Sequence, residues 1–157
     1  MQKLILRQFH NADIILFEKW LYIPHVAKWY HDPLDWIDEV KKRNSEFSFL
    51  HHFIVELEGK PIGFCQYYEY HHSGEDWHGN IDITNTYSID YLIGDTEYLG
   101  KGYGTAIIKA LIEEIKLHNN PNRIIVQPEL ENKASCNTLL SCGFCFDSNN
   151  EIYIMEI

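Results

Sequence analysis

The 157-residue sequence has no apolar run close to the roughly 20 residues that a membrane-spanning helix requires. Residues 1–7 also lack the long apolar core and the small-residue cleavage site of a signal peptide, and their pattern is more typical of a first strand. We therefore expect a cytoplasmic protein with no membrane partner. Hydrophobic residues make up 45% and charged residues 23%, which is ordinary for a globular protein, and we expect residues 1–157 to form one domain.

Basic side chains are few: 13 Lys and Arg stand against 23 Asp and Glu, which gives a net charge of −10. Because nucleic-acid phosphates are bound mainly through Lys and Arg, this balance argues against a nucleic-acid partner. An acidic surface suits a cationic substrate, and it is equally typical of proteins that use charge for solubility.

Cysteine is also scarce, with 4 residues, and a disulfide framework is not expected in a reducing compartment. Cys142 and Cys145 match a C-x-x-C spacing, but no second Cys or His pair stands at a ligand spacing, so we expect ordinary thiols. The histidine pairs 51–52 and 71–72 are adjacent in sequence, and neighbours in a strand point to opposite faces. Neither pair makes a metal site alone, so we predict no metal.

Hydrophobic periodicity predicts a mixed order of strands and helices. Strands are expected at residues 3–9, 52–58, 62–70, 87–94, 123–127, 144–147 and 151–157. Helices are expected at 11–20 with Asn11 as N-cap, from Pro33 to about Glu46, from just after Gly104 to near Asn119, and at 132–141. Residues 21–30 are expected as a helix or an aromatic-rich loop, and residues 71–85 as a polar loop. The strand–helix–strand unit around the longest helix should cross over right-handed, with its strands parallel.

The most informative segment is Leu99-Gly100-Lys101-Gly102-Tyr103-Gly104-Thr105, between a predicted strand and an amphipathic helix. Glycines at alternate positions let backbone N–H groups crowd around an anion, and the helix N-terminus adds unpaired donors and a favourable dipole. The pattern predicts a pyrophosphate cradle, although a helix-start loop without a ligand has the same composition. It is not a P-loop, because no Gly-Lys-Ser/Thr ends it. It also follows the fourth strand, whereas a dinucleotide fingerprint opens the fold.

Together with Tyr87-Ser88-Ile89-Asp90-Tyr91-Leu92-Ile93-Gly94, this segment resembles the acetyl-CoA motif of the GNAT acetyltransferase superfamily. The resemblance covers nearly the whole chain in its order of elements. The most similar subgroup is the aminoglycoside 6′-N-acetyltransferases, through residues 25–30, residues 60–68, Ile89-Asp90 and Asn132. The resemblance implies an α/β (α+β) GNAT fold, in which a central mixed, mostly antiparallel sheet is splayed in the middle and flanked by helices.

The same resemblance implies a site for acetyl-CoA (coenzyme A) as co-substrate. Backbone amides of the glycine-rich segment would hold the pyrophosphate, and the strand around Ile93 would pair with the pantetheine arm like an added strand. An exposed backbone N–H there would polarise the acetyl carbonyl and stabilise the oxyanion. Asn132 would touch the pantetheine, serve as a helix N-cap, or both. The implied cofactor-binding residues are Leu92, Ile93, Gly94, Leu99, Gly100, Lys101, Gly102, Tyr103, Gly104, Thr105 and Asn132.

Asp90 is the residue that we expect to bind the amine and to act in catalysis. An ammonium cannot attack a thioester until it loses a proton, and a nearby carboxylate can orient it and accept that proton, directly or through water. A strand carboxylate that faces solvent is the alternative. Further substrate-binding candidates are Gln66 and Tyr68, on one face of the preceding strand, and Trp29 and Tyr30 as an aromatic wall. Aromatic side chains are, however, more often part of a core.

Several residues depart from the family pattern. Leu99 stands where most of the superfamily has Arg or Gln, and Leu139 stands where the family often has a tyrosine general acid. Because leucine cannot donate a proton, another tyrosine or water must act, or the thiolate leaves unprotonated. Gln127 stands where we expect an acid in the aminoglycoside enzymes. The loop acids Glu75 and Asp76 suit a polyamine, but a solvated loop is favoured.

The expected function is an N-acetyltransferase that moves acetyl from acetyl-CoA to a primary amine, by direct attack in a ternary complex. The first candidate is the 6′-amine of an aminoglycoside, with antibiotic resistance as the role; the acceptor is expected to be a small, polycationic molecule. The alternatives are an enzyme for another amine (a polyamine, an amino acid or a protein N-terminus) and a non-catalytic acyl-CoA-binding domain. An acetyl-enzyme on Cys65 or Cys136 is not expected, because no base is paired with either. Monomer and homodimer both remain open.

Overall fold

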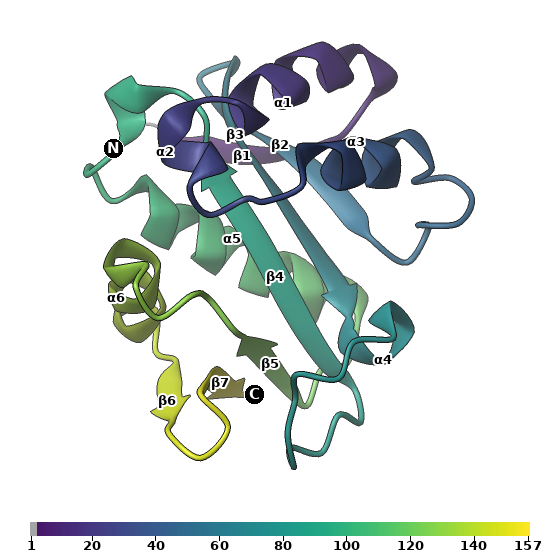
Figure 1. Ribbon diagram of the computed structural model, residues 1–157, viewed down its shortest axis with the longest axis vertical. Coiled ribbons are helices and arrows are strands. Elements are labelled where there is room, and N and C mark those ends of the chain that lie inside the picture. Colours follow the sequence, from purple (N-terminus) through teal and green to yellow (C-terminus); the bar gives the residue numbers. More distant parts are fainter. Residues whose placement is uncertain (1–2) are drawn as a thin grey trace.

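The computed structural model describes residues 3–157, and its centre is a seven-stranded sheet of order β1-β2-β3-β4-β5-β7-β6 (Figure 1). The strands are β1 (Leu4–Gln8), β2 (His51–Leu57), β3 (Lys60–Glu69), β4 (Thr86–Ile93), β5 (Arg123–Val126), β6 (Cys145–Asp147) and β7 (Ile152–Glu156). The helices are α1 (Ile14–Leu21), α2 (Pro24–Ala27), α3 (Pro33–Lys41), α4 (Tyr70–Ser73), α5 (Tyr103–His118) and α6 (Lys133–Ser141), with 3-10 turns η1 (Asn11–Asp13) and η2 (Thr96–Tyr98). This mixed, mostly antiparallel sheet with flanking helices confirms the predicted fold class.

Helices cover both faces of the sheet (Figure 1). The two faces alternate along β4: Leu92 belongs to the core cluster with α1 and α3, whereas Ile93 packs against the cluster formed with α5. The residues that α5 buries repeat at helical spacing, as the sequence predicted: Ile107, Ile108, Leu111, Ile112 and Ile115. None of the helices in the described part of the chain combines the length and apolar character needed to cross a membrane.

Strands β1 to β4 form an antiparallel meander. The turn between β2 and β3 passes through Glu58 and Gly59, whose φ angles of 50° and 79° are both left-handed, as a two-residue type I′ turn requires. The resulting register places His52 opposite Gln66, and Gln66 opposite Asp90. These three side chains therefore lie in one row across the sheet.

The sheet splays between β4 and β5. These parallel strands pair only at Thr86 with Arg123 and at Tyr87 with Ile124, and then diverge (Figure 1). Within residues 3–157, the edge of β4 beyond Tyr87 therefore has no neighbouring strand on this side. The parallel arrangement around α5 is the one that the sequence predicted.

Some element boundaries differ from the sequence expectation. The first helix begins as η1, with His10 rather than Asn11 at the N-cap position. Helix α3 ends at Lys41 and not near Glu46, because the chain continues there as turns. The segment 71–85 is not entirely loop, since it begins inside the short helix α4.

Candidate functional site

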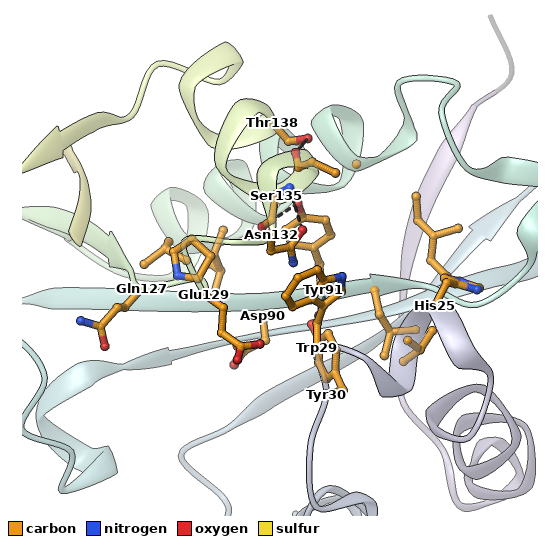
Figure 2. A pocket seen from close by; sticks show the side chains of 18 of the residues that line it. His25, Trp29, Tyr30, Asp90, Tyr91, Gln127, Glu129, Asn132, Ser135 and Thr138 are labelled. Atoms are coloured by element: carbon orange, nitrogen blue, oxygen red, sulfur yellow. Dashed lines mark hydrogen bonds between the residues drawn. The ribbon is translucent and has the colours of Figure 1, made fainter. Parts of the chain in front are cut away.

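A pocket of about 700 Å³ lies where β4 and β5 diverge (Figure 2). Its walls come from the α2–α3 segment, β4, the loop before α5, the β5–α6 connection and α6. Side chains of the lining that Figure 2 labels are His25, Trp29, Tyr30, Asp90, Tyr91, Gln127, Glu129, Asn132, Ser135 and Thr138. The pocket thus extends from the N-terminal helices to α6, with β4 running through it.

The glycine loop, residues 99–105, forms one end of the pocket and leads into α5. Gly100 and Gly102 have φ angles of +69° and +85°, a region that strains other residues. A Cβ atom added at either glycine would meet no atom within 4 Å, so open space lies beside both. Gly102 is also the N-cap of α5, whose first N–H groups lack partners within the helix. The loop therefore presents backbone donors to an open space, as an anion cradle requires.

Gly104 brings α5 close to β4 and α6. A Cβ atom placed there would lie 3.5 Å from the Tyr91 ring and 3.5 Å from the Thr138 methyl group. The Tyr91 hydroxyl lies 3.3 Å from Ser135 Oγ, so β4 and α6 are connected across the splay. Burial raises the pKa of Tyr91, which keeps this hydroxyl protonated.

Two side chains from the α2 region bond the open edge of β4. The Tyr30 hydroxyl donates to the Tyr91 carbonyl oxygen, and His25 Nε2 lies 2.7 Å from the Ile93 carbonyl oxygen. Because the N–H and C=O of one residue in an antiparallel strand point to the same side, the N–H groups of Tyr91 and Ile93 face this edge too. The edge can therefore pair with an extended ligand that carries amide groups.

Asp90 lies near the middle of the pocket, with its carboxylate held from β3 (Figure 2). Gln66 Nε2 donates to Asp90 Oδ2 at 2.8 Å. Burial raises the pKa of Asp90 to about 6; the Gln66 bond opposes this shift and the charge of Glu75 adds to it. This carboxyl is thus mostly ionised at neutral pH, yet it binds a proton more readily than an ordinary aspartate.

Glu75 lines the pocket from a loop that is exposed to solvent, as the sequence analysis favoured. Its carboxylate is exposed but fixed, because the Tyr68 hydroxyl donates to Oε1 at 3.0 Å and Trp77 Nε1 donates to Oε2 at 3.0 Å. Burial, with the charge of Asp90, raises the pKa of Tyr68, so its hydroxyl remains a donor. Glu75 is therefore held beside the pocket on the side where Tyr68 and Asp90 lie.

Two further carboxylates belong to this region. Glu39 of α3 is half-buried and lies outside the pocket lining; burial raises its pKa to about 7, with the charges of Asp90 and Glu75 adding to the shift. Glu129 lines the opposite wall, and its carboxylate lies 3.2 Å from His31 Nε2. Together these acids give the pocket a negative potential that favours cationic ligands.

Most residues that the sequence predicted for the site line this one pocket. They are Trp29, Tyr30, Tyr68, Asp90, Leu92, Ile93, Leu99, Gly100, Gly102, Tyr103, Gly104, Thr105 and Asn132. Gln66, Gly94 and Lys101 do not line it. Gln66 is buried behind Asp90, whereas a Cβ atom at Gly94 would lie 2.3 Å from the Trp20 ring, so this glycine serves close packing. Their binding roles remain predictions.

Asn132 is the N-cap of α6, as expected, because its side-chain oxygen accepts the Ser135 N–H at 3.2 Å. The sequence analysis missed His25, Tyr91 and Ser135 as polar contributors to the pocket. Of these three, only Tyr91 could have been found from the sequence. It follows Asp90 in a strand, so its side chain points to the opposite face of the sheet from Asp90.

Leu139 and the cysteines lie outside the pocket lining. Leu139 is fully buried in the core cluster with α5, so the position that often carries the family's tyrosine is a packing position here. Cys65 and Cys136 are buried too, and burial raises the pKa of Cys65 well above its usual value, which disfavours a thiolate nucleophile. Cys142 and Cys145 are free thiols. Among the described residues, no group of three His, Cys, Asp or Glu side chains is placed to hold a metal ion.

A loop with open space beside its backbone donors, a strand edge without a neighbouring strand and a buried carboxylate thus meet in one pocket of a splayed sheet. Residues 10–152 match the family model of the acetyltransferase (GNAT) domain. The chain therefore belongs to the GNAT acetyltransferase family, which confirms the resemblance seen in the sequence.

Known proteins resemble the chain in sequence and in fold. It is 26% identical over 147 residues to an aminoglycoside N(6′)-acetyltransferase type 1 of Klebsiella pneumoniae, with 88% of this chain and 72% of that protein covered. A crystal structure of an aminoglycoside acetyltransferase in complex with coenzyme A and kanamycin has a TM-score of 0.82 at 23% identity. The match covers 98% of this chain and 95% of that one. A spermidine N-acetyltransferase from Vibrio cholerae, with CoA and spermine, has a TM-score of 0.73 at 16% identity, covering 98% and 94%. At these identities the two structures show a shared fold.

Proposed function

We propose that this GNAT enzyme transfers the acetyl group of acetyl-CoA to a primary amine of a polycationic acceptor, with the 6′-amine of an aminoglycoside as first candidate. The observation that carries the proposal is the Asp90 carboxylate, which lies in one pocket with both the open glycine loop and a wall of aromatic and acidic side chains. Because the glycine loop and Asp90 line the same pocket, we propose direct attack in a ternary complex.

The donor half of the pocket fits coenzyme A. The open space beside Gly100 and Gly102 would take the diphosphate, which the backbone N–H groups of the loop and of the first turn of α5 would bind. The open edge of β4 at Tyr91 and Ile93 would pair with the amides of the pantetheine arm. When bound, acetyl-CoA supplies the activated thioester.

Asp90 would bind the ammonium form of the acceptor and accept its proton. At neutral pH the carboxylate is mostly ionised, so it attracts the cation, and its raised pKa makes proton transfer easier than to an ordinary aspartate. The Gln66 bond occupies Oδ2, and we assign Oδ1 to the amine. Loss of the proton leaves the lone pair that forms the new C–N bond.

The number of carboxylates favours an acceptor with several positive charges. Glu39, Glu75 and Glu129 lie around Asp90, and the pair of hydrogen bonds to Glu75 holds it ready for a second ammonium group. A polyamine is the second candidate acceptor, because the same acids would bind it. Gln127 favours this candidate, since it brings an amide to the pocket where we expect an acid in the aminoglycoside enzymes.

Release of the thiol needs a proton source other than Leu139. The Tyr91 hydroxyl is protonated and lines the donor half, where it contacts Ser135. A thiolate with a pKa of about 8.5 also leaves acceptably without a donor. Tyr91→Phe tests the first route: a large fall in thiol release with unchanged coenzyme A affinity assigns the proton to Tyr91. An unchanged rate means that water supplies the proton or that the thiolate leaves unprotonated.

The test of the proposed function is a panel of amines with purified protein and acetyl-CoA, with thiol release as the readout. We expect kanamycin-like compounds to release far more thiol than buffer does, and mass spectrometry to show one acetyl group on the 6′-amine. Thiol release with spermidine and not with any aminoglycoside would replace the first candidate by the second. Calorimetric binding of coenzyme A without acetylation of any amine would contradict the catalytic proposal.

A further inference from the structure

A row of polar side chains crosses three strands behind the pocket. His52 of β2, Gln66 of β3 and Asp90 of β4 occupy directly paired positions, so they share one face of the sheet. His52 is only 4% exposed and Gln66 only 2%. Buried polar groups without hydrogen bonds destabilise a fold, so their presence in this row needs a reason.

The bonding of the row is known at its Asp90 end. Gln66 Nε2 donates to Asp90 Oδ2 at 2.8 Å, whereas Gln66 Oε1 and both ring nitrogens of His52 are buried and lack a partner of standard geometry among residues 3–157. An ionised carboxylate only accepts hydrogen bonds, so it selects the NH₂ end of the amide. The orientation that satisfies Asp90 leaves Gln66 Oε1 as a buried acceptor, with His52 at the paired position on its other side.

His52 can supply one donor. Burial lowers its pKa to about 4, with the charges of Arg43 and then His51 adding to the shift and the Gln66 amide opposing it, so the imidazole is neutral above pH 5. A neutral imidazole carries one N–H and one acceptor nitrogen. The rings of Phe9 and Phe64 lie 6.2 and 5.8 Å from the imidazole, and they offer no hydrogen-bond acceptor of comparable strength. Gln66 Oε1 is a buried acceptor at the directly paired position, and it matches this donor.

We propose that His52 is a positioning residue, whose N–H binds Gln66 Oε1 and thereby keeps the Gln66 NH₂ group directed at Asp90. Without this donor the amide can rotate and turn its oxygen toward the carboxylate, which would lose the bond to Oδ2. Asp90 would then be both less well oriented and a weaker acid, because the Gln66 bond lowers its pKa. The part of this inference that concerns catalysis rests on the proposed function, whereas the arrangement of the row does not.

The first experiment needs no substrate. In protein with ¹³C-labelled aspartate carboxyl groups, NMR titration gives the pKa of Asp90 in wild type, His52→Phe and Gln66→Leu. We expect both variants to raise the pKa of Asp90 by a similar amount, and the double variant to raise it no further. Each pKa unit corresponds to a proton affinity about tenfold higher. The charges of Glu75 and Glu39 interact with Asp90 and therefore also affect its pKa. Glu75→Gln should be titrated in parallel to measure that contribution.

Two further variants make the test specific to the donor. His52→Asn and His52→Gln keep an N–H group at this position. Unlike His52→Phe, at least one of these two variants should keep the pKa of Asp90 at its wild-type value. His51→Phe is the matched control, because His51 is the neighbouring residue on the opposite face, where it stacks on Tyr67 at 4.5 Å, and it should leave Asp90 unchanged. A normal Asp90 titration in folded His52→Phe, or additive shifts in the double variant, would overturn the proposal.

The wild-type protein gives an independent readout if His52→Phe does not fold. The ¹⁵N spectrum of the His52 ring should show one neutral tautomer from pH 5 to 8, with a slowly exchanging N–H. A charged ring at pH 6, or two tautomers in rapid exchange, would refute the fixed donor. Once an acceptor amine is known, the acid limb of kcat/KM should move with the NMR value while the KM for acetyl-CoA stays constant. If no amine is acetylated, the proposed function fails, and the NMR result still decides the inference.

Discussion

Lowering the pH from 7 to 5 should reduce kcat/KM for the acceptor amine about tenfold, because the proposed mechanism uses the ionised form of Asp90 as the proton acceptor. With its pKa raised to about 6 by burial, Asp90 is ionised in about 90% of molecules at pH 7 and in about 10% at pH 5. An aspartate with an ordinary pKa of about 3.9 would still be about 90% ionised at pH 5. The acceptor stays an ammonium throughout this range, so its own titration does not contribute to the change.

The assay is the initial rate of thiol release from pH 5 to 8, at subsaturating amine and saturating acetyl-CoA. Asp90→Asn is the matched variant, because its side-chain oxygen can still accept the Gln66 bond but cannot take up a proton. We expect a low and pH-independent rate from this variant. Its coenzyme A affinity should equal that of the wild type, since the contacts proposed for the glycine loop use backbone groups that do not titrate.

Two results would refute this reasoning. One is a wild-type profile that stays level between pH 7 and pH 5 while the protein remains folded by circular dichroism. The other is an Asp90→Asn variant that keeps the wild-type rate and the same acid limb, which would assign the titration to another group. Glu39 is the other acid whose pKa is raised by a comparable amount, to about 7. If Glu39 is the titrating group, Glu39→Gln should remove the acid limb.

Four further changes have expected outcomes. Asp90→Asn should raise Tm at pH 8 but not at pH 4. Folding raises the pKa of Asp90 from 3.8 to about 6, so the wild-type folded state loses stability as the pH rises through this interval. The loss is on the order of 1–3 kcal/mol, and the neutral asparagine avoids it. Gly102→Val should abolish coenzyme A binding in calorimetry by filling the cradle, and its φ of +85° adds about 1–2 kcal/mol of strain. Gly94→Ala should lower stability by about 1–3 kcal/mol in urea unfolding, because the new Cβ meets the Trp20 ring at 2.3 Å. Leu139→Tyr should also lower stability, by overpacking a fully buried site, without raising the rate of thiol release; a faster, equally stable variant would contradict this account of Leu139.

Features set by local sequence were predicted well. The repeat of apolar residues in α5 gave its buried face, and the strand patterns at residues 52–58 and 62–70 gave β2 and β3. The glycine loop was found because positive φ angles at a helix start leave a compositional mark, here at Gly100 and Gly102. Each of these depends on neighbours within a few residues along the chain.

Features set by tertiary contacts were not predicted. Glu75 reaches the pocket only because its carboxylate bonds Tyr68 and Trp77, and nothing in a polar loop indicates those partners. The approach of His25 to the Ile93 carbonyl depends on how α2 packs over a strand that is distant in sequence. The polar row from β2 to β4 depends on the register of three strands, which single-strand patterns do not give.

The alternating pleat of β4 brings two kinds of side chain to one pocket. Asp90 and Leu92 face α1 and α3, whereas Tyr91 and Ile93 face α5. Inserting or deleting a single residue in this strand would reverse which side chains face which helices, while changes in α3 or in the segment after α4 would alter only the side on which Asp90 lies. Under the proposed function, the choice of acceptor would therefore evolve through α3 and the segment after α4, while the contacts to the acetyl donor stay the same.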